Sequence, residues 1–367
     1  MFVEQISISD FRNYASVEIR PAPQGITLFQ GDNGSGKTNL LEAVAYLSLL
    51  KSFRGAPAGS MVRNGADRAV LRATADREGR SLLIETELNL TGRDKIRLNR
   101  QPVRRNDDLF GVVLVTVFSP DDIEMVKGGP HSRREYLDDL GGALQPKHKA
   151  ACTELERVLK QRNALLRSAG GTLRGSMAGT LEIWDEKLAQ VGEVVAESRE
   201  ALVGTLEKRV DEAYRVLSGD AVTTDGGVRL VYERSWPGQL LSALHDARAE
   251  DVRRGMTSTG PQRDDLHTHI NGLTARTQAS QGEQRSLALS LRLAGHAVVS
   301  DRQGSSPVLL LDDVFSELDP DRSAALASCL PAAQVLLTAA GPVPPVLPVA
   351  HRARVHNGSV QWGGSAP

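Results

Sequence analysis

The chain has 367 residues, 40% of them hydrophobic, and a formal net charge of −1 from 44 basic and 45 acidic side chains. Its length predicts two or three domains with sizeable cores, and its neutral balance restricts any nucleic-acid surface to a local patch. The two cysteines, Cys152 and Cys329, lie far apart and argue against a disulfide framework or a zinc site. No apolar run is long enough for a membrane span and no signal-peptide pattern is present, so we expect a cytoplasmic protein.

The first third of the chain reads mainly as β-structure. Alternating apolar residues predict a hairpin over residues 2–20, with Arg12 and Asn13 at its tip. The short β-branched run 25–30 predicts a buried strand, and 39–50 predicts a helix after it. Three further antiparallel strands are expected, at 69–76, 81–90 and 94–99.

Between that strand and that helix lies Gly31-Asp-Asn-Gly-Ser-Gly-Lys37-Thr38, which has the spacing of a phosphate-binding loop. Backbone N–H groups can close around a polyphosphate only where side chains are absent, and the helix start adds unpaired donors. Lys37 would reach the β and γ phosphates, and Thr38 a Mg²⁺ ion. The loop therefore predicts nucleoside triphosphate binding, with contacts from Asn33, Gly34, Ser35 and Gly36.

The middle of the chain changes from strand to helix. The continuous apolar run 112–118 predicts a parallel strand buried on both faces. From about 121 to 219 the pattern is helical, and apolar residues at helical spacing from Leu181 to Val210 predict a long helix that forms a hairpin with 148–168. Because the heptads are not sustained, we expect a bundle packed on its own chain rather than a coiled-coil arm.

Two more strands, 228–233 and 266–272, are expected on either side of a helix at 240–254. His267 and His269 alternate on one of them, and we interpret both as surface residues rather than metal ligands because no carboxylates cluster beside them. Residues 343–367 are rich in Pro, Gly and Ala, and we expect the last ten to be poorly ordered.

A second motif follows the apolar strand that begins at Pro307 and ends in two acids. An acid at the carboxyl end of a strand beside a phosphate loop can hold Mg²⁺ through water, and a second can orient the attacking water. We assign Asp312 to the metal and Asp313 to the water. A third motif, the turn around Ser280 and Gly282, leads into an apolar helix and is another possible anion site.

The order of these motifs resembles the ABC-type ATPases, and the chain as a whole resembles the RecF family of bacterial recombination-repair ATPases, which are related to the heads of SMC and Rad50 proteins. The resemblance covers almost the whole chain. It rests on these segments: Asp10-Phe-Arg-Asn-Tyr14, the phosphate loop with Lys51-Ser-Phe-Arg54, Phe118-Ser-Pro-Asp-Asp122, Lys127-Gly-Gly-Pro130, Arg133-Arg134, Thr259-Gly-Pro-Gln-Arg-Asp-Asp-Leu266, Ser280-Gln-Gly-Glu-Gln-Arg285 and Leu311-Asp-Asp-Val-Phe-Ser-Glu-Leu-Asp319.

The resemblance implies an α/β fold, an ABC-type P-loop ATPase head. Lobe I would comprise residues 1–119 and 303–367, and the inserted, mainly helical lobe II residues 120–302. The family implies that ATP and Mg²⁺ bind with help from Arg12 and Asn13, and that Ser280 and Gly282 reach the γ phosphate of a partner copy. It further implies an ATP-dependent homodimer, binding of duplex DNA near single-strand gaps, slow hydrolysis, and work with RecR and RecO to load RecA.

The chain departs from the ABC pattern at three positions. Residues 116–121 offer no glutamine to contact the metal, and Thr338 stands where the switch histidine is usual. Gln262 stands where the family is expected to have histidine. The first two changes leave the sensing of the γ phosphate open.

DNA binding would need a local basic surface, because the net charge is close to zero. A dimer could collect a groove from arginine-rich segments: Arg97, Arg100, Arg104, Arg105, Arg253 and Arg254. Two other classes stay open, an ABC-type ATPase subunit that drives a membrane partner and an SMC-like structural clamp. The sequence has no basic amphipathic segment that favours the first, and its helical insertion is too short for the long arm of the second.

Overall fold

The computed structural model describes residues 1–103, 109, 112–219 and 226–363, which form two compact units. Unit 1 consists of Met1–Asp122, Val216–Gly219 and Ala288–Pro367, and unit 2 of Ile123–Arg215 and Asp220–Leu287. The lobe limits expected from the sequence stay a prediction. Within the described ranges, no helix has the length and apolar character needed to cross a membrane.

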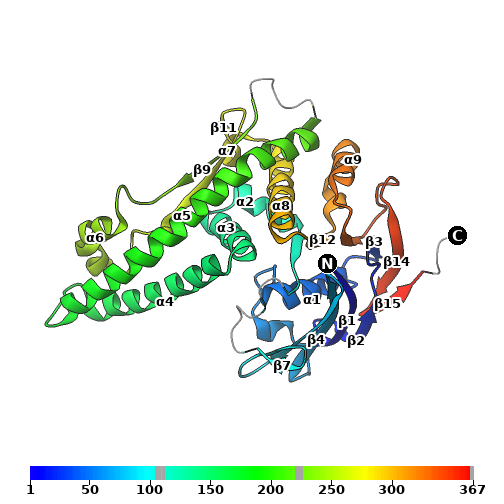
Figure 1. Ribbon diagram of the computed structural model, residues 1–367, viewed down its shortest axis with the longest axis horizontal. Coiled ribbons are helices and arrows are strands. Elements are labelled where there is room, and N and C mark those ends of the chain that lie inside the picture. Colours follow the sequence, from blue (N-terminus) through cyan, green and yellow to red (C-terminus); the bar gives the residue numbers. More distant parts are fainter. Residues whose placement is uncertain (104–108, 110–111, 220–225, 364–367) are drawn as a thin grey trace. The chain divides into compact units, whose positions relative to one another are not determined.

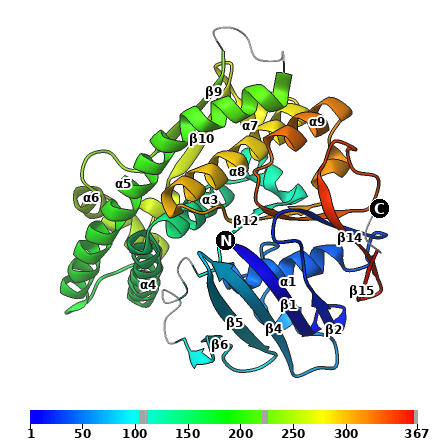
Figure 2. The same cartoon turned by 45° about the vertical axis from the view of Figure 1, so that its right-hand side comes forward.

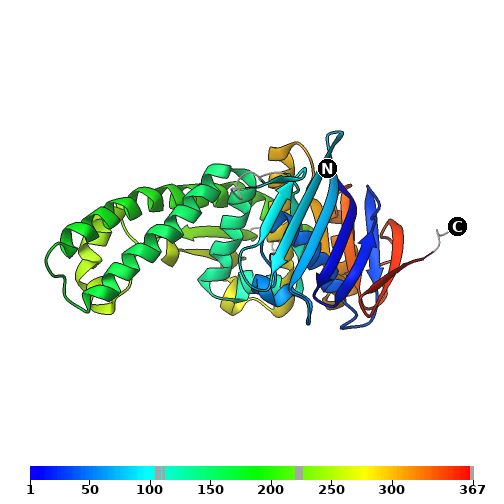
Figure 3. The same ribbon diagram turned by 90° about the horizontal axis from the view of Figure 1, so that it is seen from below.

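The first sheet of unit 1 is antiparallel throughout, and its strands lie side by side in Figure 3. Its strand order is β2-β1-β4-β5-β6-β7. The bounds are β1 (Phe2–Phe11), β2 (Tyr14–Ile19), β4 (Arg68–Arg77), β5 (Arg80–Asn89), β6 (Lys95–Leu98) and β7 (Gln101–Pro102). The predicted N-terminal hairpin is confirmed: Phe11 pairs with Tyr14, which leaves Arg12 and Asn13 at the tip.

The second sheet of unit 1 is parallel except at one edge, with the order β15-β14-β3-β13-β12-β8. Its strands are β3 (Gly25–Gln30), β8 (Val115–Phe118), β12 (Val308–Asp312), β13 (Gln334–Ala339), β14 (Val349–His356) and the antiparallel β15 (Ser359–Trp362). Because the other strands are parallel, their carboxyl ends share one edge of the sheet. That edge collects the motifs of unit 1.

Helix α1 (Lys37–Leu49) packs against strands of both sheets (Figure 2). Its residues from Leu40 to Leu47 are all buried, so it has no solvent-facing stripe and little amphipathic character. Ile6 and Ile8 of the first sheet and Phe29 of the second join the same apolar cluster. The helix that follows the phosphate loop is therefore fixed in the centre of the unit 1 core. Unit 1 also contains α9 (Pro320–Cys329) and the short 3-10 turns η1 (Ala58–Met61), η3 (Pro120–Ile123) and η6 (Val314–Glu317).

Unit 2 is mainly helical, with one small antiparallel sheet of order β11-β10-β9 (Figure 1). Its helices α4, α5 and α6 share a core that includes Val158, Leu188 and Leu240, as expected for a bundle packed on its own chain. The elements are α2 (Glu124–Lys127), α3 (Pro130–Leu144), α4 (Pro146–Ala169), α5 (Met177–Ser218), β9 (Val228–Glu233), α6 (Leu240–Arg254), η5 (Pro261–Arg263), β10 (Asp265–Ile270), β11 (Leu273–Thr274), α7 (Ala275–Gln278) and the start of α8 (Gln281–Gln303).

Two expectations from the sequence need correction. The run 112–118 does form a parallel strand, paired with β12, but only from Val115, and among the described residues this strand, β8, is an edge strand rather than one buried on both faces. Val113 enters the apolar cluster without strand pairing, which explains the apolar run. The last ten residues are not all poorly ordered: β15 covers Ser359–Trp362, because it pairs with β14 and its Trp362 ring contacts Phe29.

Unit 2 contains a buried ionic network around Arg162, which is fully buried on α4. Its guanidinium donates to Asp185 on α5 at 2.8 Å and to Asp251 on α6 at 2.7 Å. Thr257 accepts a third hydrogen bond at 2.8 Å. Both carboxylates are also fully buried; Asp185 accepts a further hydrogen bond from Arg248 at 2.6 Å, whereas Asp251 pairs with Arg162.

We predict that Arg162→Met lowers the free energy of unfolding of unit 2 by about 3–5 kcal/mol, because buried Asp251 would lose its guanidinium partner and buried Asp185 would keep only that of Arg248. Urea denaturation followed by circular dichroism measures the change. Arg157→Met is the matched control on the same helix, since Arg157 is exposed and pairs with exposed Glu154. Equal stability of the two variants would contradict the structural role of the network.

Candidate functional site

The phosphate loop lies at the carboxyl edge of the parallel sheet, between β3 and α1. Gly34 and Gly36 have φ angles of 81° and 111°, in the region that favours glycine. A Cβ atom at Gly36 would lie 2.5 Å from Asn13 Nδ2, so the side chain of Asn13 packs directly on the loop. The glycines predicted from the motif are therefore required by the observed backbone.

Two residues of the β1–β2 hairpin tip hold this loop. Asn13 donates from Nδ2 to the carbonyl of Ser35 at 3.1 Å, and the Tyr14 hydroxyl donates to the carbonyl of Gly36 at 3.0 Å. Asn39 donates to Asn13 Oδ1 at 2.8 Å and fixes the orientation of its amide. The hairpin tip thus contacts the loop through Asn13, which the sequence had indicated as a site residue, and through Tyr14, which it had not, while Asn39 of α1 orients Asn13.

The C-terminal hairpin also contacts the loop, a feature that the sequence did not predict. The Val355 carbonyl oxygen lies so close to Gly31 that a Cβ there would approach it to 2.2 Å. In the β14–β15 turn, Gly358 donates its N–H to the carbonyl of Ser35 at 3.4 Å. A Cβ at Gly358 would lie 2.4 Å from the carbonyl oxygen of Asn13, so this turn also requires glycine.

Lys37 folds back over the loop that precedes it. Its ammonium donates to the carbonyl oxygens of Gly31 at 2.7 Å and Asp32 at 2.9 Å, and the side chain is buried. These carbonyls hold the positive charge at the mouth of the loop, beside the N-terminus of α1. An anion bound by the loop N–H groups would meet both the ammonium and the positive end of the helix dipole.

Asp312 ends β12 and is buried beside the loop. Its Oδ1 atom accepts hydrogen bonds from Thr38 Oγ1 at 3.0 Å and Thr338 Oγ1 at 2.7 Å. Burial raises the pKa of Asp312, the charge of Asp313 raises it further, and the two hydroxyl donors oppose this shift. The structure thus brings the predicted Thr38 and Asp312 together, and adds Thr338.

Asp313 adopts a left-handed backbone, with a φ of 50°. Its N–H donates to Thr338 Oγ1 at 3.0 Å, and its Oδ1 accepts from the Ala340 N–H at 3.3 Å. Non-glycine residues in this region cluster at functional sites, where the surrounding contacts hold the strained backbone. Thr338, at the position expected to hold a switch histidine, therefore links both acids through one hydroxyl.

Arg12 is held by a partner that the sequence did not indicate. Its guanidinium donates to both carboxylate oxygens of Glu42 at 2.8 Å, and Glu42 is fully buried on α1. Ser52 also donates to Glu42, at 2.5 Å. A single acid inside an otherwise apolar helix was the available signal. The pair anchors the hairpin tip to α1, and the Arg12 side chain remains 19% exposed.

Ser280 and Gly282 lie in unit 2, at the start of α8. Glu283 accepts from the Ser280 N–H at 2.7 Å, while the Ser280 hydroxyl accepts from the Glu283 N–H at 3.3 Å. This reciprocal arrangement is a capping box. Ser280 is exposed, so the cap leaves the helix terminus accessible to a ligand or a partner.

The arginines proposed as a DNA groove lie on different elements of the chain, and the groove that a dimer could collect from them stays a prediction. Arg253 and Arg254 on α6 both pair with Glu250, which compensates their charge. Arg97 and Arg100 are exposed residues of unit 1, at β6 and in the turn that follows it. Arg104 and Arg105 lie outside the described residues.

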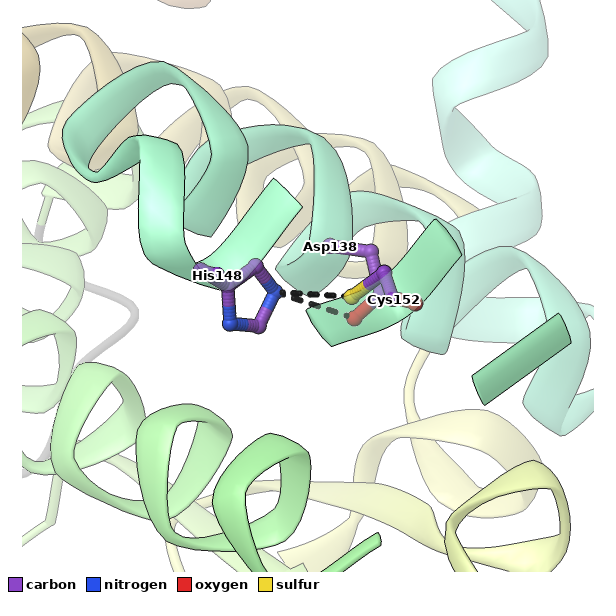
Figure 4. Close-up of side chains that lie close together, drawn as sticks. All are labelled: Asp138, His148 and Cys152. Carbon is purple, nitrogen blue, oxygen red and sulfur yellow. Dashed lines mark hydrogen bonds and ion pairs between the residues drawn. The ribbon is translucent and has the colours of Figure 1, made fainter. Parts of the chain in front are cut away.

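Asp138, His148 and Cys152 gather between α3 and α4 and offer three potential metal ligands (Figure 4). His148 Nε2 lies 3.3 Å from both Asp138 Oδ1 and Cys152 Sγ. Both oxygens of Asp138, however, already accept hydrogen bonds from Arg199, at 2.8 and 2.7 Å. A guanidinium on the same carboxylate opposes a cation there, so we interpret the group as a cross-link between α3, α4 and α5.

The pKa values agree with this interpretation. Burial alone would raise the pKa of Asp138, but hydrogen bonds from His148 and Arg199 outweigh it and hold the pKa well below its usual range. Burial and the Asp138 charge raise the pKa of Cys152 to about 12, so the thiol is protonated at neutral pH within this cross-link.

Glu182, Asp185 and His245 form a second group of potential metal ligands. Arg248 donates to both of its carboxylates at 2.6 Å, and this guanidinium also opposes a cation there. His267 pairs with Glu233 and is partly exposed. Neither His267 nor His269 belongs to a potential ligand group among the residues that the structure describes.

A model of the RecF/RecN/SMC N terminal domain matches residues 2–340 of the chain. The DNA replication and repair protein RecF of Streptomyces avermitilis is 42% identical over 93% of this chain and 94% of its own length. The corresponding RecF of Kineococcus radiotolerans is 40% identical over 97% of each chain.

Solved structures agree with these matches. A structure of the recombination mediator protein RecF-ATP in the RecFOR pathway is 28% identical, with a TM-score of 0.89 over 99% of this chain and 98% of the other. An SMC head bound to the C-terminal winged-helix domain of ScpA shares the fold at 17% identity and a TM-score of 0.57, over 99% of this chain and 97% of that one. The chain therefore belongs to the RecF family of DNA replication and repair proteins, whose fold is the ABC-type ATPase head of the RecF/RecN/SMC group.

Proposed function

We propose that this chain is an ATP-driven switch of recombinational repair, which binds ATP at the phosphate loop, dimerises and binds DNA. The observation that carries the proposal is the joint hydrogen bonding of Asp312 by Thr38 and Thr338 beside the loop. A buried acid gains little from such a position in the fold alone, since burial opposes its charge. Its use is to face a ligand that carries compensating charge.

The donor set suits Mg²⁺, which prefers hard oxygen ligands and usually keeps several waters. Thr38 Oγ1 and Asp312 Oδ1 would hold the ion, directly or through water. A bound Mg²⁺ would neutralise charge on the β and γ phosphates. Lys37 would exchange its bonds to the carbonyls of Gly31 and Asp32 for bonds to phosphate oxygens, and Asn33, Gly34, Ser35 and Gly36 would supply backbone donors. Arg12 and Asn13 would keep the hairpin tip against the nucleotide side of the loop.

Hydrolysis would depend on Asp313. Its carboxylate accepts from the Ala340 N–H and stays within the network of Thr338, so it is held in one orientation. We assign it to orient the attacking water and accept its proton. A single copy would hydrolyse ATP slowly, because half of the groups that contact the γ phosphate would be supplied by a partner copy.

The partner copy would supply these groups from the capped N-terminus of its α8. Ser280 and Gly282 would face the γ phosphate held by the other chain, and the same contact would repeat by twofold symmetry. Such an isologous pair closes at two copies and buries two nucleotides. ATP binding would therefore favour the dimer, and weak hydrolysis would release it.

DNA is the proposed target of the dimer. The RecF structures that this chain resembles belong to the RecFOR pathway, and the curated relatives are DNA replication and repair proteins. We propose that this chain binds duplex DNA near single-strand gaps, changes its ATPase rate on DNA, and acts with RecR and RecO in loading RecA.

Lys37→Met is expected to weaken ATP binding about 10- to 100-fold, because one charge-assisted hydrogen bond contributes roughly 1.5–3 kcal/mol. Titration with a fluorescent ATP analogue in the presence of Mg²⁺ measures the affinity. Lys160→Met, at an exposed position of α4, is the control and should bind as the wild type does. Unchanged affinity in Lys37→Met would refute the assignment of the loop.

Asp313→Asn should keep ATP binding and dimerisation but lower turnover by about 10²- to 10⁴-fold, the usual contribution of a general base. The amide oxygen can still accept from Ala340, so the loop geometry is retained. Phosphate release and sedimentation velocity are measured on the same sample. Asp321→Asn, an exposed acid at the start of α9, controls for loss of charge. A fully active Asp313→Asn would exclude this residue as the base.

Ser280→Arg should bind ATP and remain a monomer in sedimentation velocity with ATP and Mg²⁺, whereas the wild type becomes a dimer. Ser280→Ala is the matched control, since it removes the helix cap, at a cost of about 1 kcal/mol, without adding bulk. It should still dimerise. If Ser280→Arg dimerises like the wild type, the composite site is wrong and Ser280 is only a helix cap.

A further inference from the structure

The C-terminal part of the chain has an unusual charge distribution. No Asp or Glu follows Asp321 in the sequence, while Arg352 and Arg354 lie two residues apart near the C-terminus. Such asymmetry within a chain of nearly zero net charge is the pattern expected of a local anion-binding patch.

On strand β14 these basic residues lie on one exposed face. Ala353 and Val355 are buried in the unit 1 core, and Arg352, Arg354 and His356 alternate with them and are exposed. Successive residues on one face of a strand are about 6.7 Å apart, so the two guanidiniums start from backbone positions in a regular row. Neither arginine forms an ion pair with any residue in the described part of the chain.

This row of cations borders a hollow at the carboxyl edge of the sheet. The hollow has a volume of about 760 Å³, and its lining includes Arg352, Arg354, His356, Gly341, Gly31 and Asp32. Asp32 is its only acidic lining residue among those described. The site is therefore open, predominantly cationic and adjacent to the first residues of the phosphate loop.

Arg68 and Arg72, two exposed arginines on the first sheet of unit 1, have carboxylate partners. On the outer face of the first sheet, Arg72 lies 2.8 Å from Glu85, and Arg68 lies 3.5 Å from Glu87. Lys95 also pairs with Glu87. That face alternates in charge and has little net attraction for a polyanion, whereas the β14 row has no carboxylate partner.

The β14–β15 hairpin is also held to the rest of unit 1 by several contacts. The ring of Trp362 on β15 lies 6.1 Å from that of Phe29 and 6.0 Å from that of His351, and Trp362 also lines the hollow. The turn that follows β14 contacts the phosphate loop through Gly358 and Ser35. A ligand of Arg352 and Arg354 would therefore bind a rigid part of unit 1 that adjoins the nucleotide site.

We propose that Arg352 and Arg354 form a contact for the sugar-phosphate backbone of DNA, independent of its sequence. The inference rests on the DNA binding proposed above and assigns that binding to a named surface. A row of unpaired guanidiniums suits a row of phosphates, because each can donate to phosphate oxygens in a fork. This surface differs from the arginine segments suggested by the sequence, of which Arg253 and Arg254 pair with Glu250.

The test compares the wild type with the double variant Arg352→Gln/Arg354→Gln. The probe is a fluorescently labelled duplex with a single-strand gap, titrated with ATP and Mg²⁺ present over a series of salt concentrations. Arg68→Gln/Arg72→Gln is the matched control, because it removes the same charge from two exposed side chains on a strand of the same unit. Sedimentation velocity and titration with the fluorescent ATP analogue are done on every variant.

The proposal expects the β14 variant to bind DNA about 10- to 100-fold more weakly at 0.1 M salt, with a slope of log affinity against log salt shallower by about 2. Its ATP affinity without DNA and its dimerisation should be unchanged, and the control should bind DNA within about twofold of the wild type. Equal losses in both variants would reduce the effect to net charge and overturn the proposal.

Two other results would also overturn it. Unchanged DNA binding of the β14 variant, with DNA bound by the wild type, would refute this surface while leaving the proposed function intact. Loss of ATP-dependent dimerisation with retained DNA binding would identify the row as an interface between copies instead. If the wild type itself failed to bind the gapped duplex, the proposed function would fail first.

Discussion

The hydrogen bonds that Thr38 and Thr338 donate to Asp312 join three segments that are far apart in the sequence. They can form because β3, β13 and β12 are adjacent and parallel, so that all three segments leave the sheet at one edge. The remaining features of unit 1 support this edge. Helix α1 is buried between strands of both sheets. The tip of the β1–β2 hairpin and the β14–β15 turn both donate hydrogen bonds to the phosphate loop.

Unit 2 depends on buried ionic contacts as well as on its apolar core. Arg162 joins α4, α5 and α6, and Arg133 on α3 forms a two-pronged pair with Asp265 on β10. Such pairs add directional constraints that apolar packing lacks, and each fixes an element relative to another. The N-terminus of α8 is presented from this framework with its own cap. Shared packing of α4, α5 and α6 makes these helices a bundle within unit 2.

Much of this architecture was predictable because its signals are local. The glycine spacing of the phosphate loop, the alternation in β1 and the apolar run ending at Asp312 each reflect a short stretch of chain. The predictions failed where contacts with residues distant in the sequence decide the local structure. The run 112–118 was apolar because Val113 enters the core, and Ser359–Trp362, within the ten residues expected to be poorly ordered, form a strand because they pair with β14.

The sequence by itself determined the family, the phosphate loop, the acids at its side and the capped turn at Ser280, because these follow from residue types at fixed spacing. Only the tertiary structure decided that Glu42 holds Arg12, that Thr338 links Asp312 to Asp313, and that Arg352 and Arg354 lie unpaired beside the loop. The physical reason is that hydrogen bonding and charge compensation depend on neighbours in space. Composition records which charges a chain carries, while the fold decides which of them cancel.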